Sequence, residues 1–385
     1  MVKVYKPLFE LGRIVTGKTP KTNVVDYWGG NIPFITPTDI VGYNSYYQYE
    51  TERYVTKKGL DTQKATLLPA NSVCFSCIAS IGKACLTRTF SITNQQINSI
   101  IPNDKNDYRY ILYLLRYNLP YVQMIAGGSG SGTPIISKRK FEKFKFLIED
   151  DLKIQHRIAS ILSAYDSLIE NNTKRIRLLE KMAENLYKEW FVRFRFPGYE
   201  KAEMENKLPK GWKHGSLSDI CEFKRGKNIT ASEMIAGNVP VISAGIEPSG
   251  FHNKANVKGV SITMSSSGAN AGYIAIHYSD IWAADCSFIN ETMTSYICYV
   301  YELLNNIRGV ITNFQRGAAQ PHVYPKDINR IKLIIPSERL RVLADERLSV
   351  IHKQIDNLAK QNTLLARRRD LLLPRLMSGK LEVKP

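Results

Sequence analysis

The segment LGRIVTGK at residues 11–18 returns in altered form as ICEFKRGK at residues 220–227, and this repetition decides how the chain is organised. Four further matches follow in the same order: Ile32-Pro33-Phe34-Ile35 with Val239-Pro240-Val241-Ile242, Ser80-Ile81-Gly82 with Asn270-Ala271-Gly272, Gly132-Thr133-Pro134 with Ala319-Gln320-Pro321, and Leu179 and Leu186 with Leu365 and Leu372. Five matches in one order indicate an internal duplication, in which each half is one structural unit.

The two halves differ in length. The offset between matching residues falls from 209 at Gly17 and Gly226 to 186 at Leu179 and Leu365. The first half therefore carries 23 more residues, which we expect to be spread over its loops.

Each half combines a mixed globular part with a helix. Short β-branched and aromatic runs between Gly, Pro and Asn predict strands and loops in residues 1–148 and 213–336. Short helices are expected from Tyr108 to Tyr121 and from Tyr296 to Ile311, long helices over 153–192 and 337–377, and an ordered linker over 194–212. The predicted segments are 1–150 (first globular domain), 151–194 (central helix), 195–336 (linker and second globular domain) and 337–385 (C-terminal helix).

The long helices carry apolar residues at coiled-coil spacing. The steps alternate between four and three residues in the first helix, and apolar residues recur every seven residues in the second. The predicted seam consists of Ile154, Ile158, Ile161, Tyr165, Leu168, Leu179, Leu186, Ile351, Leu358, Leu365 and Leu372, with Asn172 and Asn362 as polar breaks. An ordinary amphipathic helix covering a core is the alternative, but about 37 residues reach roughly 55 Å, more than one compact domain needs. We therefore expect an α+β fold in which two similar mixed α/β domains are separated by two long antiparallel helices.

The charge balance indicates a polyanionic partner. The chain has 53 Lys and Arg against 35 Asp and Glu, a formal net charge of +18, which suits nucleic acid or an anionic membrane surface. No run of eighteen apolar residues predicts a membrane span, and the N-terminus lacks the apolar region of a secretory signal. Six cysteines in 385 residues are not a disulfide framework, so a reducing, cytoplasmic compartment is expected. Two unlike basic domains on a stiff spacer would read a bipartite, asymmetric DNA target.

One motif suggests an ATPase. Residues 12–19, GRIVTGKT, match the phosphate-binding pattern G-x-x-x-x-G-K-[ST], which needs a preceding strand and a helix starting at Gly-Lys-Thr. Pro20 follows at once, no helical periodicity continues, and the repeat partner CEFKRGKN loses the first Gly and the Thr. We therefore expect a turn there and no nucleotide site.

Other motifs are weaker still. Cys74, Cys77 and Cys85 lack a second CxxC or paired histidines for zinc, and the glycine-rich 127–132 follows a helix rather than the strand that a dinucleotide site requires. No catalytic set and no methylase signature of the form [DNS]-P-P-[FYW] is present in the sequence, so no catalytic, metal or cofactor-binding residue is predicted.

DNA contacts are expected from basic, amide and hydroxyl side chains on loops. In the first half these are Lys18, Thr19, Lys21, Thr36, Thr38, Ser80, Lys83, Ser131 and Thr133. Lys138, Arg139 and Lys140 are expected to contact the DNA backbone. In the second half they are Arg225, Lys227, Asn228, Ser243, Ser267, Asn270, Arg316, Gln320 and His322.

Over nearly its full length the chain resembles the specificity subunit of type I restriction–modification systems. The matching pieces are TGKTPKT (16–22), IPFITPTDI (32–40), NQQINSI (94–100), GSGTPIISKRKFEKFKFLI (130–148), the helix at 155–191, the linker FRFPGYE…LPKGW and the tail LLLPRLMSGKLEV (371–383). The resemblance implies two target-recognition domains and two conserved helical regions. It also implies assembly with two modification (methyltransferase) subunits and with restriction subunits, which would hold S-adenosylmethionine, ATP and Mg. This chain would be non-catalytic. A stand-alone DNA-binding regulator, or less favourably a P-loop ATPase, is the alternative.

Overall fold

The computed structural model describes residues 3–42, 46–127, 133–317 and 321–384. The chain divides into two compact units, which are described separately below. The first unit comprises Met1–Asn172 with Gln361–Pro385, and the second comprises Thr173–Lys360. Each unit thus contains one globular part and one half of each long helix, whereas the sequence-based boundaries treat the helices as separate segments.

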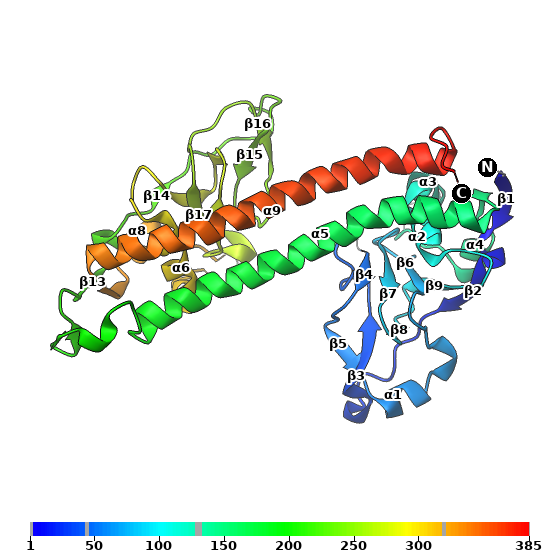
Figure 1. Ribbon diagram of the computed structural model, residues 1–385, viewed down its shortest axis with the longest axis horizontal. Helices are drawn as coiled ribbons and strands as arrows, with labels where there is room; N and C mark the ends of the chain where they lie inside the picture. The colour runs from blue at the N-terminus through cyan, green and yellow to red at the C-terminus, as the bar shows by residue number, and fades with distance from the viewer. Residues whose placement is uncertain (1–2, 43–45, 128–132, 318–320, 385) are drawn as a thin grey trace. The chain divides into compact units, whose positions relative to one another are not determined.

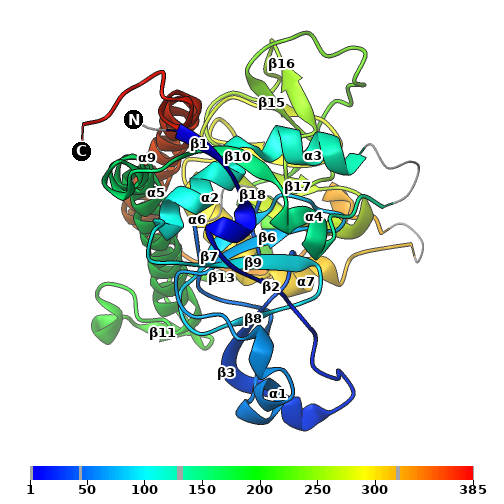
Figure 2. The ribbon, with the colours of Figure 1, turned by 90° about the vertical axis from the view of Figure 1, so that its right-hand side faces the viewer.

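The first unit is built around a five-stranded sheet of order β2-β9-β6-β7-β4, in which only β4 runs parallel to its neighbour (Figures 1 and 2). Its strands are β2 (Gly12–Thr16), β9 (Ile97–Pro102), β6 (Val73–Ser76), β7 (Ala84–Thr87) and β4 (Tyr47–Gln48). A smaller sheet has the order β5 (Arg53–Val55), β3 (Trp28–Ile35) and β8 (Ile92–Thr93), and β1 (Lys3–Pro7) pairs with β10 (Lys145–Glu149).

Alternation of side chains along these strands covers both faces of the larger sheet. Ile14 and Phe75 join the core formed with α2 (Tyr108–Tyr117), α4 (Lys138–Glu142) and α5 (Leu152–Tyr187). Their neighbours Val15 and Cys74 face the other way, into a second core with Ile35 of β3. Both faces of the sheet are therefore apolar, which explains the nearly continuous apolar runs in the sequence.

The second unit repeats this plan. Its larger sheet has the order β14 (Lys224–Arg225), β20 (Cys286–Asn290), β17 (Ser261–Ser265) and β18 (Ile274–His277). The smaller one is β16 (Gly250–His252), β15 (Val239–Ile242) and β19 (Trp282–Ala283), and β13 (Lys213–Ser216) pairs with β21 (Lys332–Ile335). The remaining α-helices are α1 (Lys57–Asp61), α3 (Leu119–Gly127), α6 (Ile297–Asn306), α7 (Arg308–Thr312), α8 (Pro325–Ile328) and α9 (Glu338–Ser378).

Equivalent backbone hydrogen bonds confirm the duplication. The amide of Gly17 donates to the Ile97 oxygen at 3.1 Å, as that of Gly226 does to Cys286 at 2.8 Å. The parallel pairs Ile35–Thr93 and Ile242–Ala283 likewise occupy the same place in the two smaller sheets. The predicted match of Gly82 with Gly272 also holds, since their amides donate to Ser76 and Ser265 respectively.

The extra residues of the first half are concentrated rather than spread over its loops as predicted. From Ile35 to Val73 there are 38 positions, against 20 from Ile242 to Ile262, a difference of 18. Ten of these 18 precede β5, which starts 18 positions after Ile35, whereas β16 starts 8 positions after Ile242. The first insertion contains β4, which has no counterpart among the described residues of the second unit.

Both predicted short helices are split in two. The segment predicted from Tyr108 to Tyr121 forms α2 and α3, with a break at Asn118, because Pro120 cannot occupy a helix interior and instead lies in the first turn of α3. The segment predicted from Tyr296 to Ile311 forms α6 and α7, with a break at Ile307. The linker is ordered as predicted: β11 (Met204–Glu205) pairs with β12 (Leu208–Pro209), and Phe196 packs on Trp212 at 5.6 Å between ring centroids.

The long helices run antiparallel within each unit. In the first unit, Asp166 of α5 pairs with Arg369 of α9, and Asn172 lies 3.5 Å from Gln361, so numbers rise along one helix as they fall along the other. In the second unit, Arg347 of α9 covers the ring of Trp190, in the π-helical turn Lys188–Val192 that follows α5. The predicted α+β class with two similar mixed parts and two long antiparallel helices is confirmed.

The predicted seam is only partly correct. Ile154, Ile158, Leu358 and the polar Asn172 are buried. The other predicted positions are partly exposed: Ile161, Tyr165, Leu179, Leu186, Ile351, Leu365 and Leu372. Leu168 is 51% exposed, so its assignment to the seam is wrong. The buried side chains recur every fourth residue, at Ile158, Leu162 and Asp166, because this part of α5 also packs on the first globular core.

Candidate nucleic-acid interface

Loops that are far apart in the first half of the sequence meet at one end of its larger sheet. We call this set the first loop edge; it comprises residues 17–21, 36–40, 77–83, 94–96 and 133–137. The Cys77 amide donates to the Gln96 oxygen at 2.7 Å, and the Ala79 amide donates to the Pro134 oxygen at 3.1 Å. The ammonium group of Lys83 donates to the Pro37 oxygen at 2.9 Å, which ties two of these loops together.

The second unit has a corresponding second loop edge, comprising residues 225–228, 243–245, 265–272, 284–285, 316 and 321–323. Its central feature is an ion pair between Arg225 Nη2 and Asp285 Oδ1, at 2.6 Å. The other carboxylate oxygen of Asp285 accepts a hydrogen bond from Ser267 Oγ, also at 2.6 Å. The guanidinium group of Arg225 is thus held in place, while its side chain remains 46% exposed.

The apparent phosphate-binding motif is part of this sheet. Gly12–Thr16 is strand β2, paired with β9, and no helix starts at the Gly-Lys-Thr that follows it. A Cβ atom on Gly17 would lie 2.2 Å from the Asn94 oxygen, and one on Gly226 would lie 2.5 Å from the Ala284 oxygen. Both glycines are therefore required for close approach of two backbone segments, which explains the motif without a nucleotide.

The predicted contact residues of the first half differ in availability. Lys18, Lys21, Thr38, Ser80, Thr133, Lys138 and Arg139 are exposed. Four others already have partners inside the protein: Thr19 donates to Gln95, Thr36 to Asp39, Lys83 to Pro37 and Lys140 to the Ile125 oxygen. Ser131 lies outside the described residues.

In the second half, Arg225, Lys227, Asn228 and Arg316 are exposed, and Arg316 pairs with Asp327 at 3.0 Å. Ser243, Asn270 and His322 are half-buried, and the isolated bridges Ser267–His322 and Arg316–His322 bring three predicted residues together. Ser267 is only 7% exposed and bonds to Asp285, so it positions that carboxylate rather than presenting its hydroxyl to a ligand. Gln320 lies outside the described residues.

The set of predicted contacts omitted three residues of the loop edges. Gln95 is exposed beside Thr19, and the half-buried Gln96 accepts a hydrogen bond from Asn94 Nδ2 at 2.9 Å. Asp285 occupies the corresponding place in the second unit, since the Ser266 amide approaches its oxygen as Cys77 approaches that of Gln96. The motif NQQINSI contained the signal for the two glutamines; Asp285 could not be identified because an isolated acidic residue in a basic protein gives no sign that it orients an arginine.

The six cysteines are free and buried, and Cys74 lies directly opposite Cys85 in the β6–β7 pair. No cluster of three or more His, Cys, Asp or Glu suited to a metal ion occurs in the described part of the chain. None of the helices in this described part combines the length and the apolar composition that a membrane span needs.

Two similar mixed α/β parts, each with exposed cations and amides at one loop edge of a strongly basic chain, define a class of protein that binds an extended polyanion at two places. A family profile described as "Type I restriction modification DNA specificity domain" matches residues 3–181 and 209–367. The chain belongs to this family, and its function is recognition of a DNA target.

Individual relatives agree with this family. The specificity subunit of the type I restriction enzyme MjaIX of Methanocaldococcus jannaschii is 29% identical over 410 residues, covering 98% of this chain and 93% of the relative. That of the HindI enzyme of Haemophilus influenzae is 30% identical over 177 residues, covering 46% of this chain and 38% of the relative. The crystal structure of the type I S subunit of M. genitalium has the same fold, with a TM-score of 0.63 at 17% identity, covering 98% of this chain and 96% of that chain.

Proposed function

We propose that this chain reads a bipartite, asymmetric target in double-stranded DNA, with one part of the target at each loop edge. The observation that carries the proposal is that equivalent places in the two units hold different chemistry. The first unit has Gln96 where the second has Asp285 with its paired Arg225. Amides suit adenine and arginine suits guanine in the major groove, so the two parts of the target should differ in sequence.

Two continuous helices support a target with an unread gap. α5 has 36 residues and α9 has 41, and each extends through both units. At ~1.5 Å per residue, a helix of this length exceeds one turn of DNA, which is ~34–36 Å.

We also propose that the chain is the non-catalytic scaffold of a larger complex. Two modification subunits would supply S-adenosylmethionine and methyl transfer, and restriction subunits would supply ATP- and Mg-dependent cleavage. The complex would work in the cytoplasm, where free thiols such as those of the six cysteines persist. The chain's own task is then to deliver the partners to the correct sequence.

The test is to map methyladenine by single-molecule sequencing in cells that express this chain with the modification subunit from its own operon. One motif made of two different parts with an unread gap of several base pairs is expected. A continuous palindrome would contradict the proposal. Tight, sequence-specific binding by the chain alone, with no association with a modification subunit, would instead favour a stand-alone regulator.

A further inference from the structure

Strand β18 ends the larger sheet of the second unit, and no described residue of that unit pairs with its outer edge. Its counterpart in the first unit, β7, has β4 on that edge, with Tyr47 beside Leu86 and Gln48 beside Thr87. All four residues of β7 are buried, whereas three of the four in β18 are only half-buried. The duplication therefore leaves open in one unit an edge that a strand covers in the other.

The open edge presents a backbone donor. The Ser265 amide bonds to the Tyr273 oxygen at 2.9 Å, so alternate residues after Tyr273 bond to β17, and Ile274 and Ile276 turn their backbone groups outward. Ile276 corresponds to Leu86, whose amide donates to the Tyr46 oxygen at 2.7 Å. The described residues of the second unit supply no such acceptor for Ile276.

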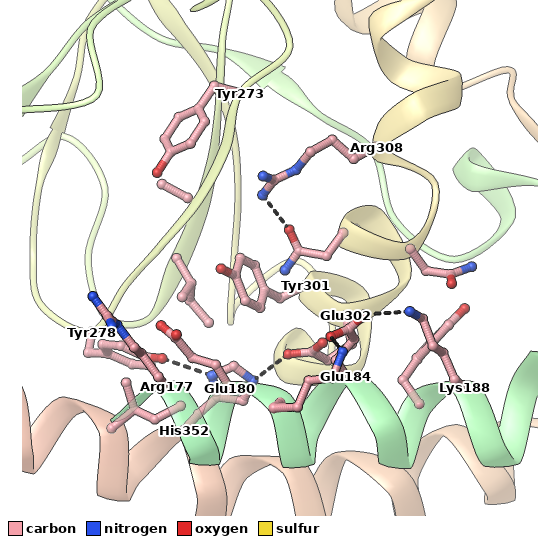
Figure 3. A pocket seen from close by; sticks show the side chains of 17 residues that line it. Arg177, Glu180, Glu184, Lys188, Tyr273, Tyr278, Tyr301, Glu302, Arg308 and His352 are labelled. Atoms are coloured by element: carbon pink, nitrogen blue, oxygen red, sulfur yellow. Dashed lines mark hydrogen bonds and ion pairs between the residues drawn. The ribbon is translucent and has the colours of Figure 1, made fainter. Parts of the chain in front are cut away.

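A groove of about 670 Å³ runs beside this edge, and all the residues that line it belong to the second unit (Figure 3). Tyr273, Tyr278 and Tyr301 give it an aromatic wall. The Tyr278 hydroxyl lies 2.8 Å from His352 Nδ1, and His352 Nε2 lies 3.1 Å from Glu302 Oε1. These polar groups satisfy one another, so the floor of the groove is fixed before a ligand arrives.

The first unit shows what fills the matching place. His352 corresponds to Asp166, by the same offset that relates Leu179 to Leu365. Beside Asp166, Tyr46 and Tyr47 pack against the first core, and burial raises the pKa of Tyr46 to about 12. An extended segment with aromatic side chains thus completes this location in the first unit.

We propose that the groove beside β18 binds an extended strand of a partner protein, which adds to β18 in parallel and places an aromatic side chain among the three tyrosines. The occupant that we assign is the modification subunit, an assignment that rests on the proposed function. Methyl transfer at a base read by the second unit requires the catalytic subunit to lie close to that unit. DNA is a poor occupant because the charges that line the groove nearly balance: three carboxylates (Glu180, Glu184 and Glu302) face four cations (Arg177, Lys181, Lys188 and Arg308), and Glu184 pairs with two of them. A DNA-binding surface is strongly basic. A second copy of this chain is also poor, because its own Tyr47–Gln48 strand is already paired with β7.

The experiment compares hydrogen exchange at residues 273–278 in the full chain, free and in the complex with its modification subunit. We expect exchange of the Ile276 amide to slow at least tenfold on assembly. Ile276→Pro removes the outward donor, which an edge strand tolerates, and should weaken assembly at least tenfold. Ile276→Val keeps the donor and the β-branched side chain, and should assemble like the wild type.

Unchanged exchange at Ile276 in a complex that still methylates a bipartite motif would overturn the docking proposal and leave the proposed function standing. Equal assembly of the Pro and Val variants, together with no protection of the Ile276 amide in the wild-type complex, would lead to the same conclusion. Failure to form any complex would overturn both proposals.

Discussion

At the scale of single residues, Arg225 has the surroundings expected of a base-reading side chain. Asp285 fixes one of its nitrogens, and the remaining donors suit the O6 and N7 acceptors of guanine. Arg225→Gln should therefore abolish the preference for guanine at one position of one part of the target, at a cost of roughly 1–3 kcal/mol. Competition binding with duplexes substituted one base at a time measures this effect.

Lys224→Gln is the matched control for Arg225→Gln, because Lys224 is its exposed neighbour in β14 and forms no ion pair with a carboxylate of the described residues. It should weaken binding to all duplexes alike and reduce the salt dependence by about one phosphate contact. An equally uniform loss for Arg225→Gln would show that Arg225 contacts phosphate rather than a base.

A second residue-scale prediction concerns the buried ion network of the first unit. The carboxylate of Asp166 accepts from the Tyr113 hydroxyl at 2.5 Å, from Arg116 at 3.1 Å and from Arg369, and its side chain is 2% exposed. Asp166→Asn removes the buried negative charge that faces Arg116 and Arg369, while Arg369 keeps its ion pair with Asp370, so the first unit should lose about 3–5 kcal/mol of stability. Exchange of the slowest amides in β6 and β9 measures that loss.

The control for Asp166→Asn is Asp26→Asn, which breaks an ion pair with Lys58 on the surface of the same unit. Both partners are more than two-thirds exposed, so the change should cost less than about 1 kcal/mol. If the two variants were equally stable, the buried network would make no net contribution to the fold.

At the scale of elements, the β17–β18 pair should respond to acid. His277 of β18 is half-buried beside Thr263, with Nε2 2.8 Å from the hydroxyl oxygen, and desolvation lowers its pKa from 6.5 to about 4. The unfolded chain therefore takes up a proton at a higher pH than the folded chain. The contribution of His277 to stability is complete above about pH 6.5 and is lost as the pH falls towards 4, by at most about 3 kcal/mol.

His277→Gln tests this dependence, because glutamine keeps an acceptor for Thr263 but does not titrate. Urea unfolding of the second unit at pH 7 and pH 5 should show a smaller loss of stability for the variant than for the wild type. Parallel losses in the two proteins would assign the acid sensitivity to other groups.

The elements also show how far sequence reasoning reaches. The duplication and the long helices were predictable, because repeats and helical periodicity are local signals. The exposure of Leu168 was not, since a heptad pattern assumes that a helix has one partner, whereas α5 packs on both α9 and the first core. Strand β4, only two residues long, exists because the β7 edge is available to it, which is a tertiary cause.

The candidate site was also predictable only in part. Basic and amide residues at turns could be picked from the sequence, and Lys18, Lys227 and Arg225 are indeed exposed at the loop edges. The sequence could not predict which of these side chains are already bonded to another residue of the protein. The partners of Lys83 and Ser267 come from residues 46 and 18 positions away, brought close only by the fold.

At the scale of the whole molecule, the last helix belongs to the core of the first unit. Leu376 and Met377 are buried in that core, and Lys3 donates a hydrogen bond to the Met377 oxygen. Removing residues 361–385 should therefore expose the first unit to proteolysis at low protease concentration and leave the second unit, Thr173–Lys360, resistant. Limited trypsin digestion followed by mass spectrometry checks this. Equal resistance of the two units would show that the first is complete without α9.

The packing of the end of α9 in the core of the first unit has a consequence for synthesis on the ribosome. Domains usually fold in order from the N-terminus as they emerge, at about 5–20 residues per second. Here 188 residues of the second unit are translated between Asn172 and the segment that completes the first unit. The first unit waits roughly 10–40 s with part of its apolar core uncovered. A chain that terminates early would never bring Arg369 to Asp166 and would be left as a substrate for proteases, so only full-length chains should accumulate.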